Sequence, residues 1–263
     1  MDLGLKGKNV IITGGASNIG RAITLAFAGE GANIVIADLD EKQAAKVVEK
    51  AKQTGAGKVI VVKTDVTDFG AVENMVTKVS VEMGSVDILV NNVGWDIQQL
   101  FIETGPDFWD KVININYRSV LNCTKAVLAP MREQGKGVIV SIGSDAGRVG
   151  EFKEAVYGGT KGAVIAFTKA VAREMGKYNI RLNVVCPGLT LPGSAEEYGE
   201  DSPWKMTTAF FTDEIKEKIR KNYPLRRLGT SQDIANAVLF MASEASNFIT
   251  GQTLSVSGGY SMM

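Results

Sequence analysis

Short runs of β-branched and aliphatic residues alternate along the chain with longer stretches in which apolar positions recur every three or four residues. The short runs are typical of strands buried on both faces, and the longer stretches are typical of amphipathic helices. Strands are predicted over 9–13, 33–37, 58–63, 86–91, 137–143, 180–186 and 252–256. Helices are predicted over 18–30, 41–54, 69–83, 107–133, 154–177, 212–222 and 231–243. This alternation predicts an α/β fold, in which helices cover both faces of a doubly wound parallel sheet of seven strands.

We expect the whole chain, residues 1–263, to form a single domain. Doubly wound folds often reach this length as one unit, and no repeat, low-complexity run or linker divides the sequence. One irregular stretch, 191–212, follows the sixth predicted strand. It is interrupted by Pro192, Gly193, Gly199 and Pro203. Long loops in compact domains are usually functional or disordered, which makes this stretch a candidate for a functional segment.

Composition excludes several functional classes. The 29 Lys and Arg residues balance 29 Asp and Glu residues, so no net field draws nucleic acid or an anionic membrane. No apolar stretch reaches the eighteen or so residues that span a bilayer, and residues 1–7 do not resemble a cleavable signal peptide. We therefore expect a soluble cytoplasmic protein. Cys123 and Cys186 lie in apolar stretches and are interpreted as small core residues rather than as a disulfide or a nucleophile.

The chain contains no histidine, and this narrows its chemistry. Without an imidazole there is no Ser-His-Asp system and no ordinary histidine-based metal centre, so we expect no metal. Proton transfer near neutral pH must then use a retuned carboxylate, lysine, cysteine or tyrosine. A helix would place Tyr157 and Lys161 one turn apart on one face, where the ammonium favours the phenolate. The alternative is an ordinary aromatic–lysine pair on a helix surface.

A glycine-containing turn follows the first predicted strand and opens the first predicted helix, with the sequence TGGASNIGR over 13–21. Strand, turn and helix in this order bring a pyrophosphate to the free N–H groups and the positive end of the helix dipole. The spacing is longer than that of the common dinucleotide fingerprint. A Rossmann fold that binds a dinucleotide is therefore predicted.

Asp38 ends the second predicted strand, eighteen residues after Gly20. A carboxylate there can accept hydrogen bonds from the adenosine ribose hydroxyls and repel a 2′-phosphate. No Lys or Arg occupies 14–18 or 37–41, which favours NAD over NADP as the cofactor. The alternative is that Asp38 simply caps the following helix.

Together these residues resemble the short-chain dehydrogenase/reductase family over essentially the whole chain. The similarity runs through 13–20, 65–66, 91–94, Asn116, Ser144, 157–161, Asn183, 187–188, 251–252 and 258–259. Asn18 replaces the glycine usual in the middle of the first loop, and asparagine tolerates positive φ better than most residues. Pro192 stands where the family often has a threonine, so Thr190 is the candidate for binding the nicotinamide carboxamide.

The resemblance implies roles for individual residues. Tyr157 would be the general acid or base, Lys161 would lower its pKa and hold the nicotinamide ribose, and Ser144 would orient the substrate oxygen. Asn116 would hold a proton-relaying water, with Asn114 as a competing candidate. The residues about 191–222 would form a lid over the substrate. The implied cofactor contacts are Gly14, Ser17, Asn18, Ile19, Gly20, Asp38, Asp65, Val66, Asn92, Gly94, Tyr157, Lys161, Pro187, Gly188 and Thr190.

Several stretches (94–97, 144–150, 154–157, 183–188 and 248–259) are more specific and are similar to 2-hydroxycyclohexanecarboxyl-CoA dehydrogenases and related aryl or cyclic 3-hydroxyacyl-CoA dehydrogenases. This similarity implies NAD-dependent oxidation of a β-hydroxyl in a cyclic or aromatic hydroxyacyl-CoA thioester, as in the degradation of aromatic compounds. Trp95 and Trp204 could wall the acyl group, and Arg148 could meet a CoA phosphate; ordinary packing and a solvated surface are the alternatives. Ser144 and Tyr157 would also contact the substrate.

Three other functions stay open. The chain could be an NAD-dependent dehydrogenase of a free secondary alcohol or polyol. It could be a 3-oxoacyl carrier-protein reductase, although such enzymes usually use NADPH and Asp38 argues against that cofactor. It could also be a dinucleotide-binding partner subunit without activity.

The resemblance also implies a homotetramer, although a mixed assembly with a related subunit is an alternative. The helices predicted over 107–133 and 154–177 would pair across a two-fold axis. Their apolar faces comprise Ala126, Val127, Ala129, Ala163, Val164, Ala166, Phe167, Ala170 and Val171. Ordinary core burial explains some of these residues.

Overall fold

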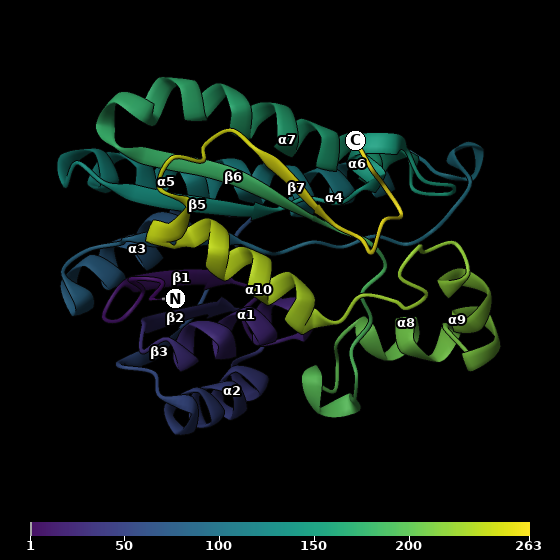
Figure 1. The fold of residues 1–263 in the computed structure, drawn as a ribbon, viewed down its shortest axis with the longest axis horizontal. Helices are drawn as coiled ribbons and strands as arrows, with labels where there is room; N and C mark the ends of the chain where they lie inside the picture. The colour runs from purple at the N-terminus through teal and green to yellow at the C-terminus, as the bar shows by residue number, and fades with distance from the viewer. Residues whose placement is uncertain (1) are drawn as a thin grey trace.

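The computed structural model describes residues 2–263 and contains one seven-stranded parallel sheet in the order β3-β2-β1-β4-β5-β6-β7 (Figure 1). The strands are β1 Asn9–Thr13, β2 Asn33–Asp38, β3 Val59–Lys63, β4 Ile88–Asn91, β5 Gly137–Ile142, β6 Ile180–Pro187 and β7 Thr253–Val256. Each overlaps one predicted strand, and the predicted fold class is confirmed.

Helices cover both faces of this sheet (Figure 1). They are α1 Asn18–Gly29, α2 Glu41–Thr54, α3 Phe69–Met83, α4 Pro106–Ile113, α5 Ser119–Glu133, α6 Ala146–Val149, α7 Ala155–Met175, α8 Trp204–Phe210, α9 Asp213–Arg220 and α10 Ser231–Ala242. Helices α1, α2 and α10 pack on one face, and α3, α5 and α7 pack on the other. Side chains alternate between the two layers along each strand, so that Ile12 of β1 joins the first core and Ile11 joins the second.

Both cysteines are free and buried, as expected: Cys123 lies in the layer under α3, α5 and α7, and Cys186 lies in β6. Val127, Val164 and Val171 also belong to the core. Core burial therefore explains these three members of the apolar faces that were assigned to a subunit interface.

The helix predicted over 107–133 is present, but it is not a regular α-helix throughout. The structure has α4, a π-helical turn over Asn114–Arg118, and then α5. A π-turn inserts one extra residue into the helical ladder and rotates the following side chains, and such turns are frequent at functional sites. Hydrophobic periodicity does not reveal it, because the apolar spacing on either side is compatible with a continuous helix.

The segment predicted as a lid contains more helix than its irregular sequence suggests. Helix α8 was missed because it is only seven residues long and follows a stretch that prolines and glycines interrupt. The Ser202 hydroxyl accepts a hydrogen bond from the N–H of Trp204, its first residue, at 3.3 Å. Helix α9 was expected and begins at Thr212, whose side chain accepts a hydrogen bond from Ile215 N–H. In Figure 1 both helices lie at the end of the molecule toward which the strands run.

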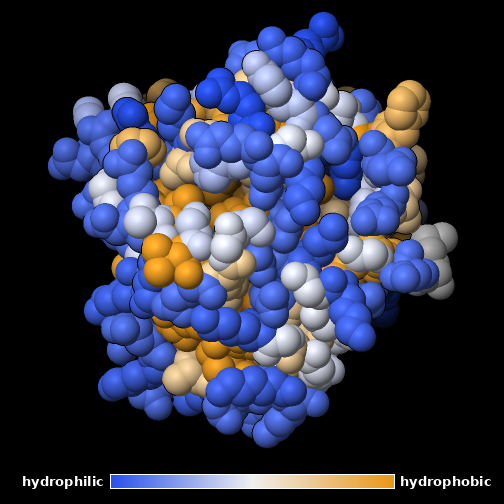
Figure 2. Space-filling model, turned by 90° about the vertical axis from the view of Figure 1, so that its left-hand side faces the viewer, coloured by the Kyte–Doolittle hydropathy of each residue, from blue (hydrophilic) through white to orange (hydrophobic). Residues whose placement is uncertain are grey.

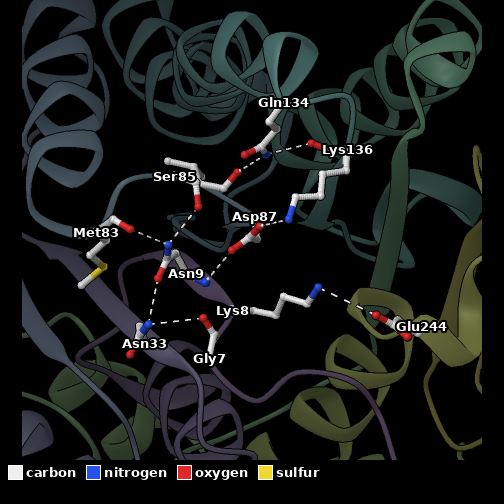
Figure 3. Close-up of polar contacts among 11 residues, drawn as sticks. Gly7, Lys8, Asn9, Asn33, Met83, Ser85, Asp87, Gln134, Lys136 and Glu244 are labelled. Carbon is white, nitrogen blue, oxygen red and sulfur yellow. Dashed lines mark hydrogen bonds and ion pairs between the residues drawn. The ribbon is translucent and has the colours of Figure 1, made fainter.

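At the opposite end, a polar network ties the amino ends of the strands together (Figure 3). Asn9 Nδ2 donates to Met83 O at 3.0 Å and to Ser85 Oγ at 3.0 Å, and Asn9 Oδ1 accepts from Asn33 Nδ2 at 2.9 Å. Asp87 accepts from Asn9 N at 2.9 Å. Figure 2 shows this end of the molecule as mostly hydrophilic, with smaller hydrophobic areas between the polar side chains.

The carboxyl ends of the strands carry the predicted chemistry. The chain turns from β1 outward to β2 and β3, and then returns to the other side of β1 as β4. The strand order therefore reverses between β1 and β4, which is the point where sheets of this kind bind their ligands. Thr13 marks this point, because its hydroxyl donates to Val90 O and accepts from Asn92 N at 2.9 Å. No helix within residues 2–263 is long and apolar enough to cross a membrane.

Candidate active site

Tyr157 and Lys161 lie on α7, with Tyr157 in its first turn. The Lys161 Nζ atom is 5.5 Å from the centre of the Tyr157 ring. Lys161 is 2% exposed, and its ammonium donates to Ile142 O at 2.9 Å. Burial lowers the pKa of Lys161 to about 8. Lys161 is therefore buried at the end of β5, and Tyr157 is half-buried beside it. The pair is not an exposed aromatic–lysine contact, which removes the alternative left open by the sequence.

The Tyr157 phenol is held in its protonated form. Burial raises its pKa above the ordinary value, and the negative charge of Glu154 raises it further, whereas a hydrogen bond with Ser144 lowers it. A neutral phenol beside a hydrogen-bonding serine can donate a proton to an oxygen bound between them. The ends of β5 and α7 thus bring three of the four predicted catalytic residues together.

Asn116 lies in the π-helical turn and is completely buried. Its amide is fixed by Trp95, whose N–H it accepts at 3.1 Å and whose carbonyl it donates to at 2.6 Å. A Cβ atom on Gly94 would lie 3.1 Å from Asn116 Oδ1 and 3.4 Å from Lys161 Nζ. Gly94 therefore adjoins both polar groups, whereas the competing candidate Asn114 is exposed.

The start of α1 is suited to an anion. Within residues 2–263 no side chain caps α1, whose N-cap is Ser17. By contrast, Asp40 and Asp68 cap α2 and α3 by accepting backbone N–H groups. The free N–H groups and positive dipole of α1 would fit a pyrophosphate.

Close packing of the backbone explains the glycine at position 20. A Cβ there would lie 2.0 Å from Gly14 O and 2.6 Å from Asn92 Nδ2, which is too close for any other residue. Gly14 itself has φ of 62°, a left-handed conformation that favours glycine. Asn92 Nδ2 donates to Thr13 O and Gly14 O, so β4 holds the loop after β1 in place.

Asp38 lies between the glycine loop and α2. Its carboxylate accepts hydrogen bonds from Ala16 N–H and from Asp40 N–H, each at 3.0 Å, and burial raises its pKa. The N-cap of α2 is Asp40, which accepts from Gln43 N–H at 2.9 Å. The alternative that Asp38 caps this helix is therefore wrong.

The remaining predicted cofactor residues follow the other strands. Asp65 accepts from the Thr67 N–H and hydroxyl with one carboxylate oxygen, and Val66 O is held by Asn122 Nδ2 at 3.0 Å. Ile19 is the second residue of α1. Pro187 ends β6, and Gly188 follows it.

Thr190 is 6% exposed and lies beside Gly229, with which it forms an isolated β-bridge. Its hydroxyl donates to Gly188 O at 3.1 Å. The hydroxyl must turn away from this carbonyl to bind a carboxamide, and that role stays a prediction.

The predicted substrate residues beyond the catalytic pair are dispersed. Trp95 packs against Phe108 with ring centres 5.9 Å apart, and Lys111 Nζ lies 4.1 Å over its ring. Trp204 begins α8 in the lid. Arg148 is an ion-pair partner of the buried Asp145 at 3.5 Å, and its side chain is 11% exposed, so a CoA phosphate could reach it only by rearranging this pair.

Two carboxyl groups beside Tyr157 were missed. Asp96 and Glu154 lie on facing loops, which Gln98 joins by donating to Glu154 Oε1 at 2.8 Å, and both line a small cavity with Phe108. Burial, followed by the charge of Glu154, raises the pKa of Asp96 to about 7. The sequence offers no signal for this pairing, because the two residues lie on separate loops without periodic pattern.

A larger groove of about 580 Å³ lies away from the catalytic residues. Side chains of α1, α2 and the lid line it, including Arg21, Lys46 and Glu196. Gln43 Nε2 donates to Glu196 O at 3.1 Å and so fastens the lid to α2. The chemistry gathers at the ends of β1, β4, β5 and β6, and not in this groove.

Comparisons with known proteins agree with this geometry. A family model described as enoyl-(acyl carrier protein) reductase matches residues 14–261. The chain is 36% identical over 256 residues to the 3-oxoacyl-[acyl-carrier-protein] reductase FabG of Staphylococcus aureus, covering 97% of this chain and 98% of the relative. It is 35% identical over 259 residues to the corresponding Thermotoga maritima reductase, covering 97% and 98%.

Solved structures are similar over the whole fold. A 7α-hydroxysteroid dehydrogenase complexed with NADH and 7-oxo glycochenodeoxycholic acid matches with a TM-score of 0.89 and 32% identity, covering 98% of this chain and 96% of that chain. A short-chain type dehydrogenase/reductase from Mycobacterium marinum matches with a TM-score of 0.87 and 27% identity, covering 98% and 97%.

The raised pKa of Asp96 predicts that Asp96→Asn stabilises the folded protein more as the pH rises. The folded protein holds this proton up to about pH 7, whereas the unfolded chain loses it near 3.8, so the folding cost of the anion grows as pH rises through that window. The melting temperature of the variant minus that of the wild type should therefore be about 2–4 °C larger at pH 8 than at pH 4. This figure includes a discount for solvent screening. Calorimetry across pH 4–8 measures this change.

Asp110→Asn provides the matched control, because Asp110 is exposed on α4. The difference in melting temperature between Asp110→Asn and the wild type should stay constant from pH 4 to pH 8. A difference for Asp96→Asn that does not grow with pH would contradict the assignment.

Proposed function

Because the chain belongs to the short-chain dehydrogenase/reductase family, we propose that it interconverts 3-oxoacyl and 3-hydroxyacyl thioesters with NAD(H). The observation that carries the proposal is the pairing of Tyr157 with the buried Lys161, in a chain whose full-length relatives are named as 3-oxoacyl-[acyl-carrier-protein] reductases. The sequence left a 3-oxoacyl carrier-protein reductase open as an alternative to a cyclic hydroxyacyl-CoA dehydrogenase. These relatives favour the reductase.

The residues present fit a nicotinamide dinucleotide. The uncapped start of α1 would receive the pyrophosphate, Asp38 would accept hydrogen bonds from the adenosine ribose, and Lys161 would hold the nicotinamide ribose. When bound, the nicotinamide supplies or accepts the hydride. The close packing of Gly20 against Gly14 and Asn92 holds the loop against the start of α1, where the pyrophosphate would bind.

The protein's own part is to position the substrate oxygen and to move one proton. Ser144 would hydrogen-bond the oxo group and orient it. The Tyr157 phenol would donate its proton to that oxygen during reduction and take it back during oxidation. The ammonium of Lys161 stabilises the phenolate left after donation, and Asn116 would hold the water that returns a proton from solvent.

Electrostatics favour the reductive direction near neutral pH. The pKa of Tyr157 is raised by burial and by Glu154, so the phenol is ready as an acid. Oxidation needs the deprotonated form and should gain rate as pH rises. This direction agrees with the reductases to which the chain is similar.

Asp38 supports NAD(H) as the cofactor. Its carboxylate faces the start of the glycine loop, where a 2′-phosphate would meet a negative charge. The similar steroid dehydrogenase is complexed with NADH.

A second candidate is the oxidation of a cyclic or aromatic hydroxyacyl-CoA. Trp95 favours it, because Asn116 fixes its backbone directly after Gly94 and the indole packs on Phe108 at one side of the site. An aromatic wall of this kind suits a ring better than a short linear chain. For either acyl group we propose a homotetramer, in which α5 and α7 would pair through their partly exposed alanines.

Steady-state assays with a panel of substrates test the proposal. The panel comprises 3-oxoacyl thioesters of carrier protein and of CoA, a 2-oxocyclohexanecarboxyl-CoA, and a free secondary alcohol with NAD. We expect turnover of the thioesters, with kcat/KM for NADH at least about tenfold above that for NADPH. Asp38→Asn should bring that ratio toward one. Rapid oxidation of the free alcohol without any thioester turnover would overturn the proposal.

Tyr157→Phe tests the assigned acid separately from binding. The variant lacks the proton donor but keeps the ring, so hydride transfer should fall by about 10²–10⁴. The affinity for NADH should stay within about twofold of the wild type. Stopped-flow absorbance measures the first quantity and NADH fluorescence the second; unchanged hydride transfer would remove Tyr157 from the mechanism.

A further inference from the structure

The glycine loop is tied to a helix that begins more than two hundred residues later in the sequence. Ser231, the first residue of α10, donates from its hydroxyl to Asn18 Oδ1 at 2.5 Å. Ser231 is 8% exposed and Asn18 is 2% exposed, so the bond is shielded from water. A hydrogen bond that joins two buried side chains restricts both elements more than a solvated one.

The backbone conformation of Asn18 explains why this hydrogen bond matters for the shape of the loop. Asn18 has φ of 43°, a left-handed conformation that an L-residue adopts at some cost. Its Nδ2 is covered and has no hydrogen-bond partner among residues 2–263, so Ser231 provides the bond that fixes the amide. Asn18 is also the first residue of α1, where the free N–H groups lie.

The start of α10 is rigid enough to serve as an anchor. Thr230 caps the helix, and Asp233 closes a capping box with Thr230. Arg227 donates to both carboxylate oxygens of Asp233, at 2.6 and 2.8 Å. The adjoining Gly229 pairs with Thr190, which follows β6. Ser231 therefore projects from a braced turn that contacts both the glycine loop and the segment after β6.

We propose that Ser231 is a positioning residue for the dinucleotide, which acts through Asn18 to hold the loop 14–20 with its free N–H groups facing the pyrophosphate. The side chain of Asn18 then anchors the loop to α10, and its backbone N–H is left to bind the cofactor. The inference rests on the proposed dinucleotide binding but is independent of which substrate is reduced.

Ser231→Ala tests the anchor. It should weaken NADH binding about three- to tenfold, the effect expected for a lost intramolecular hydrogen bond, and should raise KM for NADH with little change in kcat. In the protein without cofactor, amides of 14–20 should exchange hydrogen faster, while the rest of the sheet is unchanged. NADH fluorescence titration and hydrogen–deuterium exchange provide these measurements.

Ser243→Ala is the matched control. Ser243 is a buried serine just after the other end of α10, and its hydroxyl donates to Phe240 O at 2.8 Å. This variant loses one buried hydrogen bond of the same helix without touching the loop. It should lower the melting temperature and leave NADH affinity unchanged; an equal loss of affinity would show that Ser231 has only a structural role.

A double-mutant cycle with Asn18→Gly isolates the pair. Glycine accepts the left-handed backbone and offers no acceptor, so Ser231→Ala should change NADH affinity by less than about twofold in that background. Ser231→Thr keeps the donor and should retain wild-type affinity, which provides a test even if Ser231→Ala does not fold. The inference would be overturned if Ser231→Ala weakened NADH binding equally in the wild-type and the Asn18→Gly backgrounds. It would also be overturned if Ser231→Thr lost NADH affinity. Absence of dinucleotide binding by the wild type would instead refute the proposed function.

Discussion

The burial of one ammonium group is the constraint on which the site depends. Lys161 is 2% exposed, and in the described part of the chain its partner is a carbonyl, that of Ile142, rather than a carboxylate. Such burial is costly, which is why the pKa of Lys161 falls to about 8. This cost is offset if ribose hydroxyls and the Tyr157 phenolate that develops during the reaction interact with the Lys161 ammonium. The neighbouring features follow from this need: the small Gly94 beside Nζ, the π-turn that brings in Asn116, and Tyr157 one turn away on α7.

The two ends of the sheet are used differently. At the amino ends, Asn9 and Asp87 satisfy one another and their neighbouring backbone, so this end is saturated with internal hydrogen bonds. At the carboxyl ends, the N–H groups at the start of α1 stay available, because no described side chain caps them. Asp38 accepts backbone N–H groups of the glycine loop and of Asp40, which fixes its carboxylate in place. A hydrogen-bonded scaffold at one end thus supports the uncapped N–H groups of α1 at the other, where a ligand would complete them.

The sequence predicted the features that depend on local pattern. Alternating apolar runs located all seven strands, and the resemblance placed Ser144, Tyr157 and Lys161, which the structure brings together at the ends of β5 and α7. It did not predict the π-turn around Asn116, because the apolar spacing on each side of the turn is that of an ordinary helix. The pairing of Asp96 with Glu154 and the bond from Ser231 to Asn18 join segments far apart in the sequence, and they depend on how loops pack. The substrate residues were the least predictable, since Arg148 is held by Asp145 and Trp204 lies on a short helix within an irregular stretch.

The most direct measurement is the pH dependence of single-turnover NAD reduction by a 3-hydroxyacyl thioester, compared between the wild type and Lys161→Met. The account predicts that removing the ammonium slows hydride transfer and moves the apparent pKa of the oxidative limb upward by at least about one unit, because the phenolate loses its neighbouring positive charge. NADH affinity measured in parallel separates this effect from weakened binding. An oxidative limb that stays at the same pH, with hydride transfer at the wild-type rate, would contradict the central role of the buried lysine.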